Sequence, residues 1–268
     1  MRAILFDLDG VLYEGESPVE GAAAAIRWVQ DAGVPHLFVT NTTSRPRLSL
    51  VQKLAGFDIH ISPAAILTPP VAARQWLQDN VTGKIALFVP QATREEFAGM
   101  PALNEQAEHG AAAVVLGDLG DGWTFATLNR AFRLLITEPK PALVALGMTR
   151  YWQTPDGLQL DVAPFVVALE HAADCRAKVL GKPSPAFFEA ALHMLGVQGA
   201  ETVMIGDDIK GDVDAAQQAG LHGILVRTGK FRISDLELGI VPYTILKSVA
   251  ALPDWWRENG CGRTGSPD

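Results

Sequence analysis

Short runs of consecutive apolar residues, each followed by a polar loop and then a helical segment, constrain the fold of this chain most. Residues 3–6 and 36–39 form the first two runs. Apolar residues at consecutive positions favour strands that are buried on both faces of a parallel sheet. Helices are expected over residues 18–30 and from about 46 to 55, the first closed by Gly33 in a left-handed cap. Strands that alternate with helices across short glycine-closed joints predict βαβ units and an α/β fold.

The same alternation returns in the last third of the chain. Ser184 and Pro185 form an N-cap followed by a first-turn proline, which predicts a helix that runs to residue 195. Strands are expected at 177–180, 202–205 and 223–226, and further helices at about 212–219 and at 248–257. We therefore expect residues 1–80 and 177–257 to form one parallel-sheet core, followed by a frayed tail at 258–268.

The middle of the chain has elements of its own. Strands are expected at 84–89, 112–116 and 143–146, and a helix begins within 94–97. A second helix is predicted over residues 124–136 by an apolar stripe at helical spacing, formed by Phe125, Leu128, Phe132 and Leu135. A proline and a glycine in residues 154–157 predict a turn. Residues 81–176 are therefore expected to form a smaller α/β domain inserted into a doubly wound parallel-sheet core.

Composition and charge narrow the class of protein. The chain has 268 residues, 48% of them hydrophobic, and a formal net charge of −8. This acidic balance gives no electrostatic attraction for nucleic acid or an anionic membrane, so neither is expected as a partner. The two cysteines, Cys175 and Cys261, make neither a disulfide framework nor a zinc site. No apolar run approaches the length of a signal segment or a membrane span, so a soluble cytoplasmic protein is expected.

Polar side chains follow each strand expected in the core. Ligands of an open parallel sheet bind beyond the carboxyl ends of its strands, so these residues are the candidates for a site. The four strand ends carry Asp7-Leu8-Asp9-Gly10, Thr40-Asn41-Thr42, Gly181-Lys182-Pro183 and Gly206-Asp207-Asp208. Carboxylates, a hydroxyl and an ammonium group would thus meet at one edge of the sheet.

This set of side chains suits metal-assisted phosphoryl transfer. A phosphate monoester is a dianion that a bare carboxylate would repel, unless a bound Mg²⁺ and a lysine cancel the repulsion. Asp7 as the nucleophile would form an aspartyl-phosphate, which splits hydrolysis into two easier steps. Asp9 would protonate the leaving oxygen and then deprotonate the attacking water. Thr40, the backbone N–H groups after it, and Lys182 would hold the phosphate oxygens.

The residues at these strand ends resemble the four motifs of the haloacid dehalogenase superfamily. The motifs are the stretch from Asp7 to Tyr13, then Thr40, Lys182 and Gly206-Asp207-Asp208. The longer stretches 38–43, 179–185 and 204–208 are similar to the NagD-like phosphatases of that superfamily, which carry a large inserted cap domain. The likeness runs through nearly all of residues 1–250, and residues 129–135 of the inserted segment share it.

The resemblance implies a Rossmann-like core, an α/β cap over the site, a small phosphorylated substrate, dependence on Mg²⁺, and a homodimer. It implies that Asp7 is the nucleophile and Asp9 the acid and base. Asp7, Asp9 through its backbone carbonyl, and Asp207 would bind the metal. Asp208 and Asp212 would support the metal from an outer shell. The residues expected to bind phosphate and substrate are Thr40, Asn41, Thr42 and Lys182.

Residues 150–152 of the inserted segment are expected to recognise the leaving group of the substrate. Arg150, Tyr151 and Trp152 follow the strand expected at 143–146 and, by resemblance, belong to the cap loop that faces the active site. Arg150 would pair with a second anionic group, and either aromatic side chain would stack on a ring or exclude water. The alternative is that both aromatics pack in the cap's own core or in a dimer contact.

Two other functions fit the same scaffold. A phosphomutase also forms an aspartyl-phosphate but usually carries a smaller helical cap after the first motif, where here only residues 13–17 precede the first helix. A catalytically idle binding or scaffold protein typically lacks one of the paired aspartates, and none is missing here. Two points stay open at this stage. Asp212 fits an ordinary helix N-cap equally well, and the bond cleaved fits a monoester, a pyrophosphate or a phosphoramidate.

Overall fold

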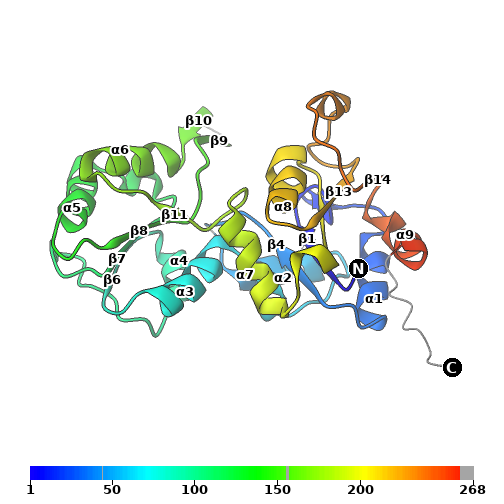
Figure 1. Cartoon of the computed structure of the whole chain (residues 1–268), viewed down its shortest axis with the longest axis horizontal. Coiled ribbons are helices and arrows are strands. Elements are labelled where there is room, and N and C mark those ends of the chain that lie inside the picture. Colours follow the sequence, from blue (N-terminus) through cyan, green and yellow to red (C-terminus); the bar gives the residue numbers. More distant parts are fainter. Residues whose placement is uncertain (44, 155–156, 260–268) are drawn as a thin grey trace. The chain divides into compact units, whose positions relative to one another are not determined.

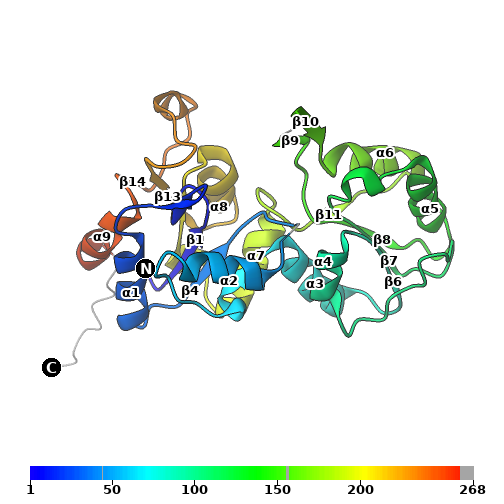
Figure 2. The ribbon, with the colours of Figure 1, turned by 180° about the vertical axis from the view of Figure 1, so that it is seen from behind.

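The structure is a computed structural model that describes residues 1–43, 45–154 and 157–259. The chain divides into two compact units, whose elements are labelled in Figures 1 and 2. The first unit contains Met1–Thr40, Arg47–Leu67 and the chain from Lys182 onward. The second contains Asn41–Pro46 and Thr68–Gly181.

A six-stranded sheet forms the centre of the first unit, and every neighbouring pair of its strands is parallel. The strand order is β14-β13-β12-β1-β4-β5, so the first strand of the chain lies in the interior of the sheet. The strands are β1 (Ala3–Asp7), β4 (His36–Val39), β5 (Ile66–Leu67), β12 (Thr202–Gly206), β13 (His222–Val226) and β14 (Thr244–Leu246). The α/β parallel-sheet core predicted from the apolar runs is confirmed, as is its Rossmann-like type, which the family resemblance implies.

Both faces of this sheet are buried. Successive side chains of a strand point to opposite faces, so burial at consecutive positions means that each face is covered. Ile4 and Phe6 have no exposed surface and pack with Ile26 of the first helix, while Leu5 is equally buried on the other face. Helices α1 and α9 lie side by side in both views (Figures 1 and 2). The helices of this unit are α1 (Ala22–Asp31), α2 (Arg47–Ala55), α7 (Pro185–Leu195), α8 (Ala215–Gln218) and α9 (Leu252–Asn259).

The second unit has a parallel sheet of its own, of four strands in the order β11-β8-β7-β6. In its core, Trp123 stacks between Phe88 and Phe165, with ring centroids 6.1 and 4.7 Å away. The strands are β6 (Ile85–Phe88), β7 (Ala113–Leu116), β8 (Ala142–Ala145) and β11 (Lys178–Val179), with the hairpin β9 (Tyr151–Thr154) and β10 (Gly157–Leu160). The helices are α3 (Pro69–Asn80), α4 (Gln91–Arg94), α5 (Phe125–Leu135) and α6 (Ala163–Ala173).

One part of the predicted apolar stripe on α5 is wrong. Phe125 is 80% exposed, whereas Leu135 is buried and Leu128 and Phe132 are partly buried. The helix packs through its C-terminal half, where Ala131, Leu134 and Leu135 are its buried residues. Phe125 is the first residue of the helix, so the periodicity continues past the end of the packed surface.

The bounds of three other helices differ from the expected ones for local reasons. Helix α1 begins at Ala22 rather than at residue 18, because Tyr13–Glu14 (β2) and Ser17–Pro18 (β3) pair as a hairpin. The helix expected at 212–219 begins earlier, as a π-helical turn over Ile209–Asp214 that leads into α8. The last helix is preceded by a 3₁₀ turn at Val249–Ala251.

Two further sequence expectations fall partly outside the described residues. The turn expected at 154–157 includes residues 155 and 156, and the tail expected at 258–268 includes 260–268, all of which lie outside the described residues. Within the described ranges, no helix has the length and apolar character needed to cross a membrane.

Candidate active site

Three buried carboxylates gather at the carboxyl edge of the six-stranded sheet. Asp7 ends β1, and Asp207 directly follows the neighbouring strand β12. Asp212 joins them from the π-helical turn. Their exposed fractions are 6%, 1% and 2%, and one carboxylate oxygen of each lies within 4.8 Å of the others. We call Asp7, Asp207 and Asp212 the acidic cluster.

A buried lysine compensates one side of the acidic cluster. Lys182 Nζ donates to Asp7 Oδ1 and to Asp212 Oδ1, each at 2.6 Å. Burial opposes its charge, but Asp212 and Asp7 outweigh the burial, so the pKa of Lys182 is raised and the ammonium stays protonated. Burial raises the pKa of Asp7 against the lowering effect of Lys182, and it raises the pKa of Asp212 to about 6. The cluster therefore has more carboxylate charge than one lysine neutralises.

Asp207 is the member of the cluster whose surroundings point to a cation. Its Oδ2 accepts the backbone N–H of Lys230 at 2.7 Å. Its Oδ1 is buried and has no hydrogen-bond partner among the described residues. Burial raises the pKa of Asp207 to about 6, although the Lys230 N–H lowers it. A buried oxygen without a partner beside two other carboxylates fits a hard divalent cation such as Mg²⁺, which takes oxygen ligands.

Two glycines make room for Asp207. Gly10 has φ +85° and Gly229 has φ +64°, a backbone region that L side chains rarely adopt. A Cβ added to Gly10 would lie 1.9 Å from Asp207 Oδ2, and one added to Gly229 would lie 2.1 Å from the same oxygen. The loop after β1 and the loop after β13 thus close on the carboxylate from two sides.

Asp208 and Asp212, four residues apart, make different contacts. Asp208 Oδ1 accepts the N–H groups of Lys210 and Gly211 at 3.0 and 2.8 Å and so caps the π-helical turn. Asp212 lies inside that turn and reaches Lys182 instead. The N-cap interpretation therefore applies to Asp208 and not to Asp212. Asp212, expected in an outer shell, offers a carboxylate oxygen within the acidic cluster itself.

The remaining predicted residues are distributed over both units. Asp9 lies on the loop after β1 with an exposed side chain, so it is not part of the buried cluster. Thr40 follows β4, is 7% exposed and donates its backbone N–H to Leu67 O at 3.2 Å. Asn41 and Thr42 belong to the second unit.

The three residues expected to read the leaving group also belong to the second unit. Arg150 is exposed and lies 5.8 Å from the ring centroid of Tyr151. Tyr151 and Trp152 are 51% and 45% exposed, so neither is buried in the core of that unit. The interpretation that they pack inside the cap is therefore weakened, and a role in substrate or subunit contact stays a prediction.

The sequence reasoning missed the loop after β13. Thr228 Oγ1 donates to Gly10 O at 2.5 Å, and the N–H of Gly229 donates to Glu14 Oε1 at 2.5 Å. Lys230 N–H holds Asp207, and its Nζ lies 3.8 Å from Asp208 Oδ2. The same rule that selected four strand ends would have selected this one, because β13 is the parallel neighbour of β12.

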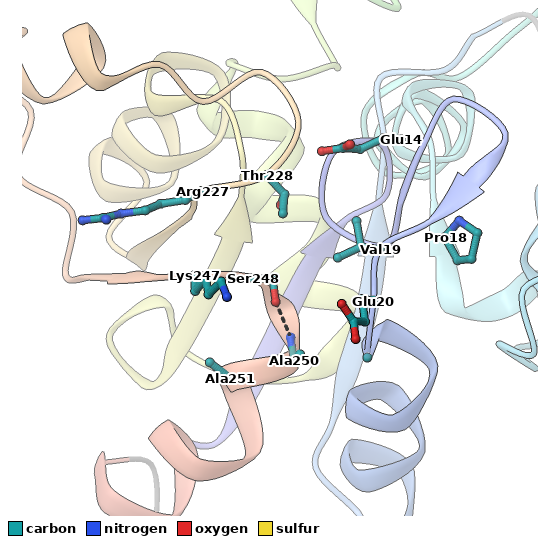
Figure 3. Close-up of a pocket in the computed structure, with 11 residues that line it drawn as sticks. Glu14, Pro18, Val19, Glu20, Arg227, Thr228, Lys247, Ser248, Ala250 and Ala251 are labelled. Atoms are coloured by element: carbon teal, nitrogen blue, oxygen red, sulfur yellow. Dashed lines mark hydrogen bonds between the residues drawn. The ribbon is translucent and has the colours of Figure 1, made fainter.

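The loop after β13 also lines a separate groove of about 1050 Å³ in the first unit. Figure 3 shows Lys247 and Ser248 on one side of this groove and Val19 and Pro18 on the other, with Glu14 near Thr228. No member of the acidic cluster lines it. The groove and the acidic cluster are therefore distinct features of this unit.

Comparisons with known proteins agree with this geometry. Residues 4–101 match the family model described as haloacid dehalogenase-like hydrolase, and residues 179–252 match a second model for hydrolases of that kind. The chain is 38% identical over 240 residues to the phospholysine phosphohistidine inorganic pyrophosphate phosphatase of Xenopus laevis, covering 88% of this chain and 86% of the relative. It is 39% identical over 249 residues to the human haloacid dehalogenase-like hydrolase domain-containing protein 2, covering 92% and 93%. Among solved structures, a hypothetical protein from Pyrococcus horikoshii superposes with a TM-score of 0.85 at 26% identity, covering 95% of this chain and 99% of that one.

Proposed function

This chain belongs to the haloacid dehalogenase-like hydrolase family, and from that membership and the geometry of its site we propose that it is a Mg²⁺-dependent phosphohydrolase of small phosphorylated compounds. The observation that carries the proposal is the pairing of Asp7 with Lys182 beside Oδ1 of Asp207, a buried oxygen with no hydrogen-bond partner in the described part of the chain. A nucleophilic carboxylate, a fixed ammonium and carboxylate oxygens able to hold a divalent cation are the groups that transfer of a phosphoryl dianion requires.

Asp7, Asp207 and Asp212, with the backbone carbonyl of Asp9, are the groups proposed to hold Mg²⁺. When bound, Mg²⁺ would offset the charge of the phosphate against the carboxylates that surround it. Lys182 would hold Asp7 in place and offer positive charge to a phosphate oxygen, as would the hydroxyl of Thr40. Asn41 and Thr42 are proposed to complete the contacts to the substrate.

The proposed reaction takes place in two displacements at phosphorus. In the first, a carboxylate oxygen of Asp7 forms a bond to phosphorus, the bond to the leaving group breaks, and Asp9 gives its proton to the leaving oxygen. In the second, Asp9 takes a proton from water, the water oxygen bonds to phosphorus, and the bond to Asp7 breaks. The products are the free leaving group and inorganic phosphate, and Asp7 and Asp9 return to their starting protonation states.

Residues 81–176 are proposed as the cap, and the leaving group is proposed to be read there by Arg150, Tyr151 and Trp152. One relative carries phospholysine, phosphohistidine and inorganic pyrophosphate in its name. A panel for this chain should therefore contain pyrophosphate and phosphoramidates as well as sugar phosphates, nucleotides and pyridoxal phosphate. We also propose a homodimer, which light scattering of the purified chain would test.

The central test is hydrolysis of an aryl phosphate by wild type and by Asp7→Asn, with and without Mg²⁺. Wild type should hydrolyse it only with Mg²⁺, and Asp7→Asn should be inactive, because an amide does not form an acyl phosphate. Lys182 keeps Asp212 as a partner in the variant, so the fold should persist, which circular dichroism would check. Asp31→Asn, an exposed position at the end of α1, is the matched control. Wild-type activity in Asp7→Asn would remove Asp7 as the nucleophile.

The two rival functions give different results in the same experiment. An idle scaffold protein would bind phosphate but turn over nothing on the panel. A phosphomutase would move the phosphoryl group within the substrate and release little inorganic phosphate. The residues after the first motif form the short hairpin β2–β3 rather than a helical cap, which favours hydrolysis over the mutase reaction.

A further inference from the structure

Lys230 places a second ammonium group beside the acidic cluster. Lys230 lies in the loop after β13, three successive residues of which donate hydrogen bonds to the site. The Thr228 hydroxyl donates to Gly10 O, the Gly229 N–H to Glu14 and the Lys230 N–H to Asp207. That backbone contact fixes the start of the Lys230 side chain directly beside a proposed metal ligand. The side chain therefore starts at the metal end of the site, whereas Lys182 occupies the end near the nucleophile.

The two lysines differ in how tightly they are held. Lys182 is 6% exposed in its side chain and makes two short hydrogen bonds to carboxylates. The Lys230 side chain is 69% exposed, and its Nζ lies 3.8 Å from Asp208 Oδ2, beyond hydrogen-bond distance. Lys182 is thus a fixed part of the cluster, whereas the ammonium of Lys230 is adjustable and interacts with the carboxylates through its charge.

The charge of Lys230 acts on the whole cluster. Burial opposes the ammonium, but Asp207, Asp7, Asp208 and Asp212 outweigh the burial and raise the pKa of Lys230. A lysine ammonium is positively charged at neutral pH, and this one lies 3.8 Å from Asp208 Oδ2 on the residue whose N–H holds Asp207. A permanent positive charge near the ligands repels an incoming divalent cation and attracts an incoming phosphate.

We propose that Lys230 is a positioning residue that sets the affinities of this site for its two charged ligands. Its charge lowers the affinity of the acidic cluster for Mg²⁺ and raises the affinity of the Mg²⁺-loaded site for phosphate. This proposal rests on the proposed function. Without Lys230, the cluster would bind its metal more tightly but would repel the phosphate dianion and the product phosphate more strongly.

The test replaces the ammonium and leaves the backbone contact in place. Lys230→Met keeps the N–H that holds Asp207 and most of the side-chain length, and Lys230→Arg keeps the charge. Lys210→Met is the matched control, because the backbone N–H of Lys210 also donates to a site carboxylate, Asp208 Oδ1, while its side chain is exposed. Calorimetry of the full chain would measure Mg²⁺ affinity and, with saturating Mg²⁺, the affinity for inorganic phosphate.

Lys230→Met should bind Mg²⁺ about 3- to 10-fold more tightly and phosphate about 3- to 10-fold more weakly, the range for a charge acting through partly solvated protein. Lys230→Arg and Lys210→Met should stay within about twofold of wild type for both ligands, and the melting temperatures of all variants should agree. Opposite changes for the two ligands are the signature, because a merely structural role would weaken both.

Unchanged affinities in Lys230→Met, or a parallel loss of both with a lower melting temperature, would overturn the proposal for Lys230. Wild type that hydrolyses aryl phosphate and binds Mg²⁺ would leave the proposed function standing in that case. Wild type that binds no Mg²⁺ would overturn both.

Discussion

Replacing Asp207 by asparagine should stabilise the metal-free protein at neutral and alkaline pH. The Asp207 carboxylate is 1% exposed, one of its oxygens has no partner among the described residues, and its pKa is raised from 3.8 to about 6. An asparagine side chain has nearly the same shape, can still accept the N–H of Lys230, and carries no charge. The substitution therefore removes a buried charge that its neighbours in the described part of the chain compensate only in part.

The magnitude follows from the shift in pKa. A group with a raised folded-state pKa favours the folded protein fully below its unfolded value and loses that contribution as pH rises through the folded value. The window for Asp207 thus runs from about pH 4 to about pH 6, and about two pKa units correspond to about 3 kcal/mol. Asp207→Asn should match wild type near pH 4 and exceed its unfolding free energy by up to about 3 kcal/mol at pH 8.

Urea denaturation in the presence of a chelator, at pH 4, 6 and 8, would measure this difference. Saturating Mg²⁺ should reverse the order at pH 8, because a ligand that binds only the folded state stabilises it and the variant lacks a proposed metal ligand. Asp214→Asn, at the end of the π-helical turn that follows Asp207 but outside the acidic cluster, is the control. A difference between Asp207→Asn and wild type that does not change with pH would refute the reasoning, as would equal stabilisation of both by Mg²⁺.

Four further variants test other parts of the site. Asp9→Asn should lower kcat about 10²- to 10⁴-fold through loss of the acid and base, with an unchanged melting temperature, measured with the best substrate of the panel. Gly229→Ala should lower the unfolding free energy by at least about 2 kcal/mol in urea denaturation, because its positive φ disfavours a side chain and its Cβ would lie 2.1 Å from Asp207 Oδ2. Arg150→Ala and Trp152→Ala should change kcat/KM unequally across the panel while inhibition by phosphate stays the same. A uniform loss with a lower melting temperature would assign these last two residues to structure.

The strand ends of the core were predictable because local pattern and position agree there. Four consecutive apolar residues before Asp7 favour a fully buried strand, and β1 is that strand. Parallel pairing then brings the end of β12 beside the end of β1, so Asp7 and Asp207 meet without any further information. The family resemblance rests on the same residues, and the family matches confirm it.

What could not be predicted depends on contacts that the pattern does not encode. The N-cap is Asp208 rather than Asp212 because the helical segment begins at Ile209, as a π-helical turn, and not at about residue 212. The exposure of Phe125 depends on where the packed surface of α5 ends. Lys230 was missed because β13 ends at Val226 and Lys230 lies four positions further on, beyond the residues that directly follow the strand.

The positions at which the backbone crosses between the two units determine how the second unit could be exchanged for that of another family member. The chain leaves the first unit directly after Thr40 and enters it for the last time directly at Lys182. Both are buried residues that we propose as phosphate ligands, and they stand next to these two junctions. Two of the four junctions of a chimera that receives another family member's second unit would therefore lie beside residues that we propose to bind phosphate. Keeping residues 1–40, 47–67 and those from Lys182 onward would retain Thr40 and Lys182, whereas Asn41 and Thr42 would come with the graft. Substrate preference could then be transplanted separately from the proposed hydrolytic chemistry.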